Sequence, residues 1–459
     1  MAKQLFKDFE PITSKAWKQK IQADLKGADY NEKLIDHSDE GIDVKPFYHK
    51  DTHQNIDLPI TEDWLITEKI YLENYAAVTK IVNDVTNRGA ESLWLIVPEA
   101  NSKLFDLLKE INTLQVPIML EFLKIDQEFL KHLDEFCAEL NITILLNFDP
   151  IKHLSSQGDW QKSQTEDLAI IQQFAQLKHL EPQLSIDARL FQNAGALKQQ
   201  ELSFSLAVLS EYFNYLNHNQ ALPQTIQLNI ITSTGSNYFF EIAKLKSYRL
   251  LIKSLANSFS VDVTLKIIAE PSQRNKTIYD YNVNMLRTTT ECMSAVLGGA
   301  DWVNNLAYDE IFHKTNEFGE RISRNQLLIL KHESYFDQVH NPTNGSYYIE
   351  ELTQQLAQKA LEEFKSIEKN EGYISELFKG NITKAIEASA KNEEEKLEKT
   401  EFVMVGTNKY ENTDDRMKAD LELYPFVKKQ QRQVKFKPII TRRLAEKIEL
   451  KRLDKEANA

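Results

Sequence analysis

The sequence contains little cysteine and no long apolar run. Cys137 and Cys292 are its two cysteines, and both fall inside apolar helical patterns. A disulfide framework is therefore excluded, and two buried free thiols are expected. No uninterrupted apolar stretch approaches the ~18 residues that a membrane-spanning helix needs. The N-terminal residues lack the apolar segment of a signal peptide. Together these absences favour a cytoplasmic protein.

The short motifs of nucleotide and metal sites are also missing. The sequence has no G-x-x-x-x-G-K loop followed by Ser or Thr, no H-E-x-x-H and no C-x-x-C. Its histidines are scattered, and only His49 and His53 have a spacing that suits two metal ligands. They lie in a loop flanked by proline and glycine, where surface histidines are the expected interpretation. No metal site is predicted.

The net charge is negative and unevenly distributed. A formal charge of −13 opposes non-specific binding to nucleic acid or to an anionic membrane. Val427–Ala459 carries a net of +7, so residues 1–426 carry −20. A basic tail on an acidic body is expected to be a solvated helix or an intramolecular clasp, with a docking segment for an acidic partner as the alternative. Nucleic-acid binding is not expected, because no aromatic stacking platform accompanies the tail.

Short β-branched apolar runs alternate with helix-length segments from Trp64 onward. The runs are apolar throughout, which is typical of strands covered on both faces in a parallel sheet. Eight such units in about 250 residues predict a (β/α)8 TIM barrel, an α/β fold. A doubly wound sheet would alternate in the same way, and the count of eight favours the barrel. The predicted strands are Trp64–Ile70, Leu93–Val97, Pro117–Phe122, Thr143–Asn147, Leu184–Ala188, Thr225–Ile231, Asp262–Ile268 and Trp302–Leu306.

Three parts are predicted along the chain. Residues 1–60 form an N-terminal arm, residues 61–390 form the barrel, and residues 391–459 form a helical, basic C-terminal linker. The linker begins with an almost entirely charged stretch, residues 391–399, which is typical of a solvated helix face.

Helices are predicted in all three parts. Trp17, Ile21 and Leu25 share one face of a short helix in the arm, which Gly27 ends. Tyr279–Leu297 is expected to be a helix that stops at the pair of glycines following it. Ile349–Ile367 has the pattern of an amphipathic helix.

Six blocks in the second half of the chain form a distinctive set: Leu286-Arg-Thr-Thr-Thr-Glu291, Ala295-Val-Leu-Gly-Gly299, Asn305-Leu-Ala-Tyr-Asp-Glu310, Arg321-Ile-Ser-Arg-Asn-Gln326, Asn344-Gly-Ser-Tyr-Tyr-Ile-Glu350 and Val405-Gly-Thr-Asn-Lys-Tyr410. They resemble blocks of the cobalamin-dependent acyl-CoA mutases, specifically the methylmalonyl-CoA mutase family. The N-terminal string Gly41-Ile42 with Lys45-Pro-Phe-Tyr48 is similar to the arm of these mutases, and Arg443-Leu-Ala-Glu446 is similar to their linker.

The resemblance implies a division of labour between two chains. Catalytic members of the family hold adenosylcobalamin in a C-terminal domain with an Asp-x-His-x-x-Gly signature, and this sequence contains no such string. We therefore expect the small, non-catalytic subunit of a heterodimer, with no cofactor bound by this chain. Adenosylcobalamin and the isomerisation of methylmalonyl-CoA and succinyl-CoA are expected in a larger partner subunit.

The resemblance also implies that the catalytic positions of the barrel have changed. The segment Ala188-Arg-Leu-Phe-Gln-Asn-Ala-Gly195 aligns with a family string whose histidine contacts the substrate thioester, and Leu190 takes the place of that histidine. Leucine cannot donate a hydrogen bond to a carbonyl. The family's catalytic tyrosine falls at Lys69, or at Tyr71 if the register shifts by two. A polar family stretch is replaced by Ala269–Asn275, where Glu270 would repel an anionic substrate. No catalytic, cofactor-binding or metal-binding residue is therefore predicted.

The segments expected to build the scaffold resemble the family pattern more closely than the site residues do. Phe239-Phe-Glu-Ile-Ala-Lys-Leu-Lys246 is similar to a mutase helix, with Phe239, Ile242 and Leu245 expected in the core. Glu241 and Lys244 are expected to be an exposed pair of little energetic weight.

Three other functions remain open from the sequence. The chain could bind acyl-CoA in a split mutase whose cobalamin domain is a separate protein, although Leu190 argues against this. It could be a scaffold or chaperone that binds a mutase transiently. It could also be an unrelated barrel lyase that uses carboxylates such as Glu270 and Glu310.

Overall fold

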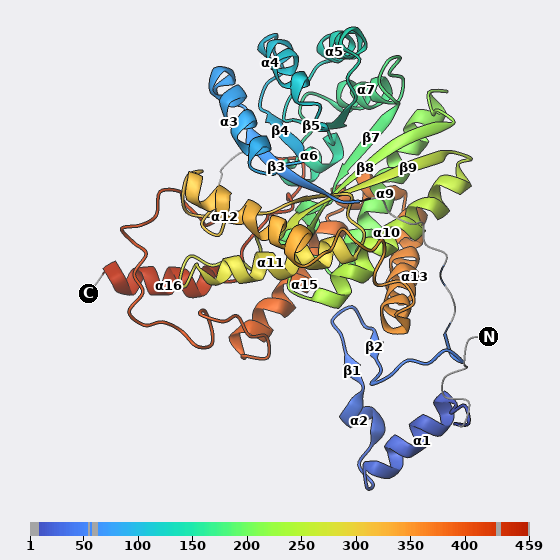
Figure 1. The fold of residues 1–459 in the computed structure, drawn as a ribbon. Coiled ribbons are helices and arrows are strands. Elements are labelled where there is room, and N and C mark those ends of the chain that lie inside the picture. The colour runs from blue at the N-terminus through green and yellow to red at the C-terminus, as the bar shows by residue number, and fades with distance from the viewer. Residues whose placement is uncertain (1–8, 54–55, 57–62, 428–432, 458–459) are drawn as a thin grey trace, which may run out of the picture.

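The computed structural model describes residues 9–53, 56, 63–427 and 433–457, and its centre is an eight-stranded parallel sheet (Figure 1). The strands follow one another around the sheet in chain order, with neighbours β6-β5-β4-β3-β10-β9-β8-β7. A doubly wound sheet would reverse its order at a switch point, so this cyclic order identifies a barrel. The strands are β3 (Leu65–Tyr71), β4 (Ser92–Val97), β5 (Ile118–Phe122), β6 (Ile144–Asn147), β7 (Gln183–Asp187), β8 (Thr225–Thr234), β9 (Asp262–Pro271) and β10 (Trp302–Asn304).

Side chains close the barrel between β6 and β7, where no strand pairing is present in the described sheet. The Leu146 N–H donates to Gln183 Oε1 at 2.8 Å, and the Phe148 N–H donates to Ser185 Oγ at 2.9 Å. These polar side chains satisfy backbone groups that would otherwise be buried without a partner. The barrel is therefore closed by a seam of side-chain hydrogen bonds.

The helices that follow the strands surround the sheet. Several begin at a side-chain cap: Asp126 accepts from the Phe129 N–H before α5, and Ser163 accepts from the Glu166 N–H before α7. These helices are α3 (Tyr75–Asn87), α4 (Lys103–Ile111), α5 (Gln127–Leu140), α6 (Pro150–Gln157), α7 (Gln164–Phe174), α8 (Arg189–Ala194), α9 (Lys198–His218), α10 (Tyr238–Ser258), α11 (Val283–Leu297) and α12 (Glu317–Leu328).

Four further helices follow in the C-terminal third, which Figure 1 colours orange to red. α13 (Tyr347–Lys369) packs on α9 and α10, while α14 (Gly372–Phe378) joins it to α15 (Asn381–Glu398). The last helix is α16 (Glu446–Ala457). No helix among the described residues is long and apolar enough to cross a membrane.

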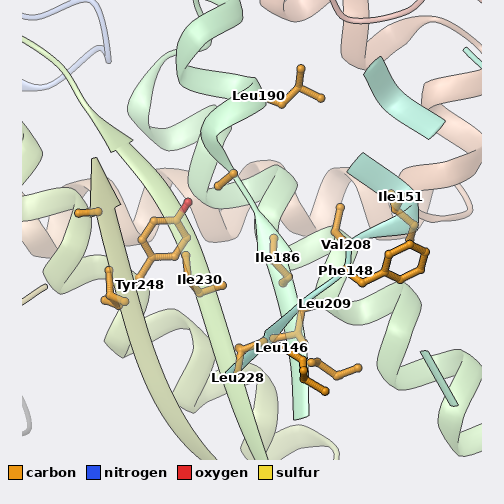
Figure 2. Packing of buried hydrophobic residues seen from close by; sticks show 14 of the residues in the cluster. Leu146, Phe148, Ile151, Ile186, Leu190, Val208, Leu209, Leu228, Ile230 and Tyr248 are labelled. Carbon is orange, nitrogen blue, oxygen red and sulfur yellow. The ribbon is translucent and has the colours of Figure 1, made fainter. Parts of the chain in front are cut away.

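The main hydrophobic core lies between the strands and the surrounding helices. Figure 2 shows Leu228 and Ile230 of β8 and Ile186 of β7 close to Val208 and Leu209 of α9. All of these side chains are almost fully buried. Since successive side chains of a strand point to opposite faces, the intervening residues point into the barrel. Those inward positions decide what the barrel can hold.

The N-terminal arm projects from the body (Figure 1). It contains α1 (Ser14–Asp24), α2 (Tyr30–Leu34) and a small hairpin of β1 (Asp36–His37) and β2 (Asp43–Val44). α1 buries none of its residues, and Trp17 meets Phe47 of the arm edge-on at 6.2 Å. The predicted helix is therefore present, but its apolar face does not enter the core.

All eight predicted strands are confirmed, whereas one helix start was wrong. α11 begins at Val283 rather than Tyr279, because the Asn284 side chain bonds both backbone groups of Thr277 and holds residues 277–284 in a compact turn. Of the two glycines at its end, Gly299 has the left-handed backbone and Gly298 remains helical. Both cysteines are buried free thiols, as predicted.

Candidate functional site at the barrel mouth

Large apolar side chains fill the interior of the barrel. They alternate along each strand with residues of the helix-facing core: Trp94, for example, lies between Leu93 and Leu95. The interior cluster consists of Trp94, Met119, Ile231, Ile268 and Trp302, with Leu65, Ile96 and Leu145 packed against it. The five central residues are at most 5% exposed. The axis of the barrel is therefore a packed core, in which two tryptophans from β4 and β10 supply the most volume.

A layer of charged side chains lies at the carboxyl ends of the strands, directly above this core. Trp94 connects the two layers, because its Nε1–H donates to Glu121 Oε2 at 2.8 Å. The carboxyl end is the face where TIM-barrel enzymes place their active sites. The charged residues come from strands β3, β5, β7 and β9 and from the segments that follow β6, β7 and β10: Lys69, Glu121, Lys152, Asp187, Arg189, Glu270 and Glu310.

Arg189 is the centre of this charged layer. Its Nη2 lies 2.6 Å from Asp187 and 2.8 Å from Glu121, and its Nη1 lies 3.3 Å from Glu270. The guanidinium also covers the ring of Trp94 at 4.7 Å. Burial opposes its charge, but the three carboxylates outweigh burial and raise the pKa of Arg189. One cation therefore satisfies carboxylates from three strands.

Lys69 neutralises the other side of the layer. Its Nζ lies 2.7 Å from Glu270 and 3.9 Å from Glu310. Burial favours the neutral form of Glu270, but Lys69 and Arg189 outweigh burial and lower its pKa. Burial and the nearby Glu270 charge raise the pKa of Glu310, despite the opposing effect of Lys69. The expectation that Glu270 would repel an anion was wrong, because its charge is paired twice.

A cavity of about 930 Å³ separates this layer from the C-terminal tail. Its floor includes Lys69, Arg189 and Leu190, and its opposite wall is formed by residues 424–427 and 434–446. The three altered regions noted in the sequence meet at this cavity, since Glu270, Gln273 and Arg274 also line it. Tyr71 does not line it and is 48% exposed, so the structure brings Lys69 into the site and leaves Tyr71 outside.

The segment Ala269–Asn275 is used to hold other parts of the structure. Ser272 and the Gln273 N–H donate to Asn193 Oδ1 at 2.8 and 2.9 Å. Arg274 binds Glu393 of α15 at 2.6 Å, and Asn275 donates to Glu291 of α11 at 2.6 Å. These side chains fix the loop after β9 to its neighbours, so their role in this fold is structural.

The basic tail is an intramolecular clasp, one of the two forms predicted for it. Lys435 pairs with Asp159 at 2.8 Å, and Lys447 pairs with Glu394 at 2.6 Å. Arg443 is buried and donates to the Lys276 carbonyl at 3.1 Å. The tail therefore attaches to the acidic body and covers the barrel mouth.

A second buried ion network joins α9, α10 and β8, and it corrects another expectation. Glu241 and Lys244 are fully buried and 2.9 Å apart, whereas an exposed pair was predicted. Lys244 also binds Glu201 at 3.0 Å and the Ser233 carbonyl at 2.6 Å. The wrong prediction has a simple cause: the pair lies on the side of α10 that faces β8 and α9, where its partners come from other parts of the chain. Phe239, expected in the core, is 48% exposed at the start of α10.

Several residues of the mouth were missed by the sequence analysis. Asp187 ends β7 and Arg189 follows two residues later, so a charged pair at the carboxyl end of a predicted strand was a usable signal. Trp94 and Trp302 lie inside predicted strands, but a strand buried on both faces gives no sequence signal for which face is the interior. Their role depends on barrel closure.

The fold and its mouth define a (β/α)8-barrel protein whose interior is packed and whose carboxyl-end face carries a self-paired ion layer. Residues 124–458 match the sequence profile of the family described as Methylmalonyl-CoA mutase. The chain belongs to the methylmalonyl-CoA mutase family.

Relatives with different names align over different lengths. The methylmalonyl-CoA mutase small subunit of Porphyromonas gingivalis is 31% identical over 89% of this chain and 71% of its own length. The small subunit of Propionibacterium freudenreichii is 26% identical over 88% of this chain and 70% of its own. The methylmalonyl-CoA mutase of Rhizobium meliloti is 34% identical, but over 50% of this chain and 33% of its own.

Proposed function

We propose that this chain is the small, non-catalytic subunit of a heterodimeric methylmalonyl-CoA mutase. It supports the isomerisation of methylmalonyl-CoA and succinyl-CoA, which takes place in a larger partner subunit. The observation that carries the proposal is the filled barrel. Trp94 and Trp302 occupy its axis, and Arg189 closes the layer above them. An acyl-CoA cannot enter a core that is packed in this way.

The alignment lengths support the same function. Relatives named small subunit align with almost nine-tenths of this chain. The methylmalonyl-CoA mutase of Rhizobium meliloti and the large subunit of Propionibacterium freudenreichii align with half of it, at 34% and 31% identity.

The mouth lacks the groups that the mutase reaction requires. Leu190 cannot donate a hydrogen bond to a thioester carbonyl, and Lys69 is already bound to Glu270. The packed interior also argues against the split-mutase alternative, in which this chain would bind acyl-CoA. Lyase chemistry by Glu270 has no support, because both of its oxygens are held by cations.

Adenosylcobalamin belongs, in this proposal, to the partner subunit. The 459 residues contain no Asp-x-His-x-x-Gly string. Among the described residues that line the mouth cavity there is no histidine that could bind cobalt, and residues 434–446 cover the space above the barrel. The mouth therefore does not fit the cofactor. We place both subunits in the cytoplasm.

The three-part division of the chain belongs to this proposal. The arm, residues 1–60, would bind the larger subunit, the barrel would supply the rest of the interface, and residues 391–459 would stabilise the barrel as a linker. Exposed aromatic side chains suit an interface, and Phe9 and Trp17 of the arm are 74% and 47% exposed. Phe6 of the arm lies outside the described residues, whereas Phe47 and Tyr48 pack within the structure.

Titration with adenosylcobalamin tests the proposal. The isolated chain is expected to leave the cobalamin absorption spectrum unchanged and to retain no cofactor in equilibrium dialysis. The pair co-expressed with the larger mutase subunit should bind the cofactor. Micromolar binding with a shifted spectrum by the isolated chain would contradict the proposed division of labour.

A further inference from the structure

The first helix of the arm is largely exposed, and Trp17 and Lys18 contact other residues of the arm, Phe47 and Tyr30. α1 buries no residue, and Ile12 and Trp17 are 58% and 47% exposed. The same helix carries Lys15, Lys18 and Lys20 against a single acidic residue, Asp24. This basic and apolar surface stands on a body whose net charge is strongly negative. It suits an apolar groove with an acidic rim.

The arm is fixed to the body by the tip of its hairpin, residues 38–42, which we call the latch, and by contacts of Lys45 and Tyr48 with α13. Ile42 is completely buried in the main core, and Glu40 is 5% exposed. Asp39 receives hydrogen bonds from Asn392 and Lys396 of α15. Gly41 has a φ of +68°, and an added Cβ would lie 3.3 Å from Lys359 Nζ. The latch therefore fits closely between α13 and α15.

Glu40 connects the latch to the buried ion network that joins α9, α10 and β8. It lies 3.4 Å from Lys198 Nζ at the start of α9, and Lys198 lies 3.7 Å from Glu241. Glu241 is held by Lys244 at 2.9 Å. A carboxylate buried against such a network has one favourable position, because leaving it unpaired would cost several kcal/mol by the general rule for buried ion pairs. The network fixes where the arm leaves the body.

A fixed arm matters because association depends on the fraction of molecules in the binding conformation. The apparent dissociation constant is the intrinsic constant divided by that fraction. An arm that pivoted freely would hold α1 in the right place only part of the time.

We propose that the latch holds α1 in the position in which it binds the larger mutase subunit, and that Glu40 and Lys198 are positioning residues for assembly. The inference rests on the proposed heterodimer. The surface that α1 binds is an apolar groove of the larger subunit, and this groove is lined by acidic residues. Neither Glu40 nor Lys198 touches the partner.

The test uses the full chain co-expressed with the larger mutase subunit. Glu40→Gln is expected to raise the dissociation constant of the pair about tenfold, which corresponds to α1 being correctly placed about one-tenth of the time. Hydrogen exchange of the free variant should increase across residues 9–34 and stay unchanged in the barrel strands. Lys198→Gln should act in the same direction. The double variant should weaken assembly by less than the sum of the two single variants, because both changes break the contact between Glu40 and Lys198.

Asp43→Asn is the matched control. Asp43 lies in the same hairpin, is exposed, and pairs with His37 of the neighbouring strand. It should leave both the dissociation constant and the exchange of residues 9–34 unchanged. Deletion of residues 1–40 separates the proposed role of the latch from the proposed heterodimer. If the deletion weakens assembly but Glu40→Gln does not, or if Asp43→Asn weakens it equally, the latch is wrong and the heterodimer stands. If the unmodified chains do not associate, the proposed function itself fails.

Discussion

Arg189 occupies the centre of the charged layer at the barrel mouth and pairs with three carboxylates there. It lies among Asp187, Glu121 and Glu270, with 13% of its side chain exposed. Burial opposes ionisation of Asp187, but Arg189 and Lys152 outweigh burial and hold its pKa well below the usual range. Among the described residues, Arg189 is therefore the one cation that these three carboxylates share.

Arg189→Met is expected to lower the free energy of unfolding by about 3 kcal/mol at pH 7, because three buried carboxylates lose their common cation. The loss should become smaller toward pH 4. Without Arg189 the carboxylates take up protons more readily, and their protonated forms no longer need the cation. Urea unfolding at several pH values measures both effects.

Arg88→Met is the control for this change. Arg88 is 44% exposed and pairs with Asp84 and Glu317 at the surface, so its loss should be below about 1 kcal/mol. Equal losses for the two variants would show that the mouth network is not a buried structural unit.

Leu190→His restores a hydrogen-bond donor at the family position without restoring catalysis. The new imidazole would still face Lys69 bound to Glu270, and the interior below it would still be filled by Trp94 and Trp302. Catalytic groups act as a unit, so one of them alone contributes little. The isolated variant, shown by circular dichroism to be folded, should give no succinyl-CoA from methylmalonyl-CoA and adenosylcobalamin. Measurable turnover would mean that the mouth has been misinterpreted.

Individual residues show where sequence reasoning reaches its limit. Leu190 and Lys69 were assigned to the site by the resemblance to the mutase family, and the structure brings both to one cavity. The environment of Glu270 was misjudged, since its partners Lys69 and Arg189 come from positions about 200 and 80 residues earlier in the chain. Partners that meet through the fold cannot be identified from local spacing.

At the scale of the element, helix α12 and strand β3 meet through a buried ion pair. Arg324 Nη1 lies 2.8 Å from Glu68 Oε2. Burial raises the pKa of Glu68 to about 7, although the Arg324 charge opposes the shift. A carboxyl group with a raised pKa in the folded state favours its protonated form. Its contribution to stability is complete below the unfolded pKa, near 4.5, and is lost as the pH rises through 7.

Glu68→Gln should remove this pH dependence. Since the amide cannot ionise, the variant is expected to gain about 3 kcal/mol relative to the unmodified protein between pH 4 and pH 8. Unfolding free energies at the two pH values measure the gain. Glu317→Gln, at an 80% exposed side chain of the same helix, is the control and should show no such gain. A gain below about 0.5 kcal/mol for Glu68→Gln would contradict the raised pKa.

The elements themselves were largely predictable, because strands buried on both faces and amphipathic helices leave clear patterns. β8 and β9 nevertheless run three residues beyond their predicted ends, to Thr234 and Pro271. Polar residues such as Ser233 and Glu270 interrupt the apolar pattern there, yet both remain in the sheet, Glu270 at the mouth and Ser233 beside Lys244. The seam between β6 and β7 was also beyond prediction, since Gln183 and Ser185 act as backbone partners only once the strands are adjacent.

At the scale of the whole molecule, the arm and the C-terminal tail are both attached to the barrel. The tail binds across the mouth through Lys435, Arg443 and Lys447, and the latch anchors the arm between α13 and α15. The charge asymmetry of the sequence indicated the first of these attachments. The second depends on Glu40 and Ile42, whose burial could not be read from an irregular segment rich in turn residues. Beyond the latch, the arm is exposed and directed away from the body (Figure 1).

The central claim is that this chain works as half of a mutase. A barrel that has lost its chemistry can still supply a large pseudo-symmetric interface to a related catalytic chain. Permanent interfaces of this kind commonly bury on the order of 2,000 Å² or more. Association should therefore be tight and one-to-one.

Sedimentation velocity of the chain co-expressed with the larger mutase subunit, with mutase activity assayed in the same fractions, tests this claim most directly. The account predicts a single one-to-one heterodimer that carries all of the activity, and an inactive peak for this chain alone. A monodisperse homodimer of this chain that ignores the larger subunit, or activity in its own peak, would contradict it.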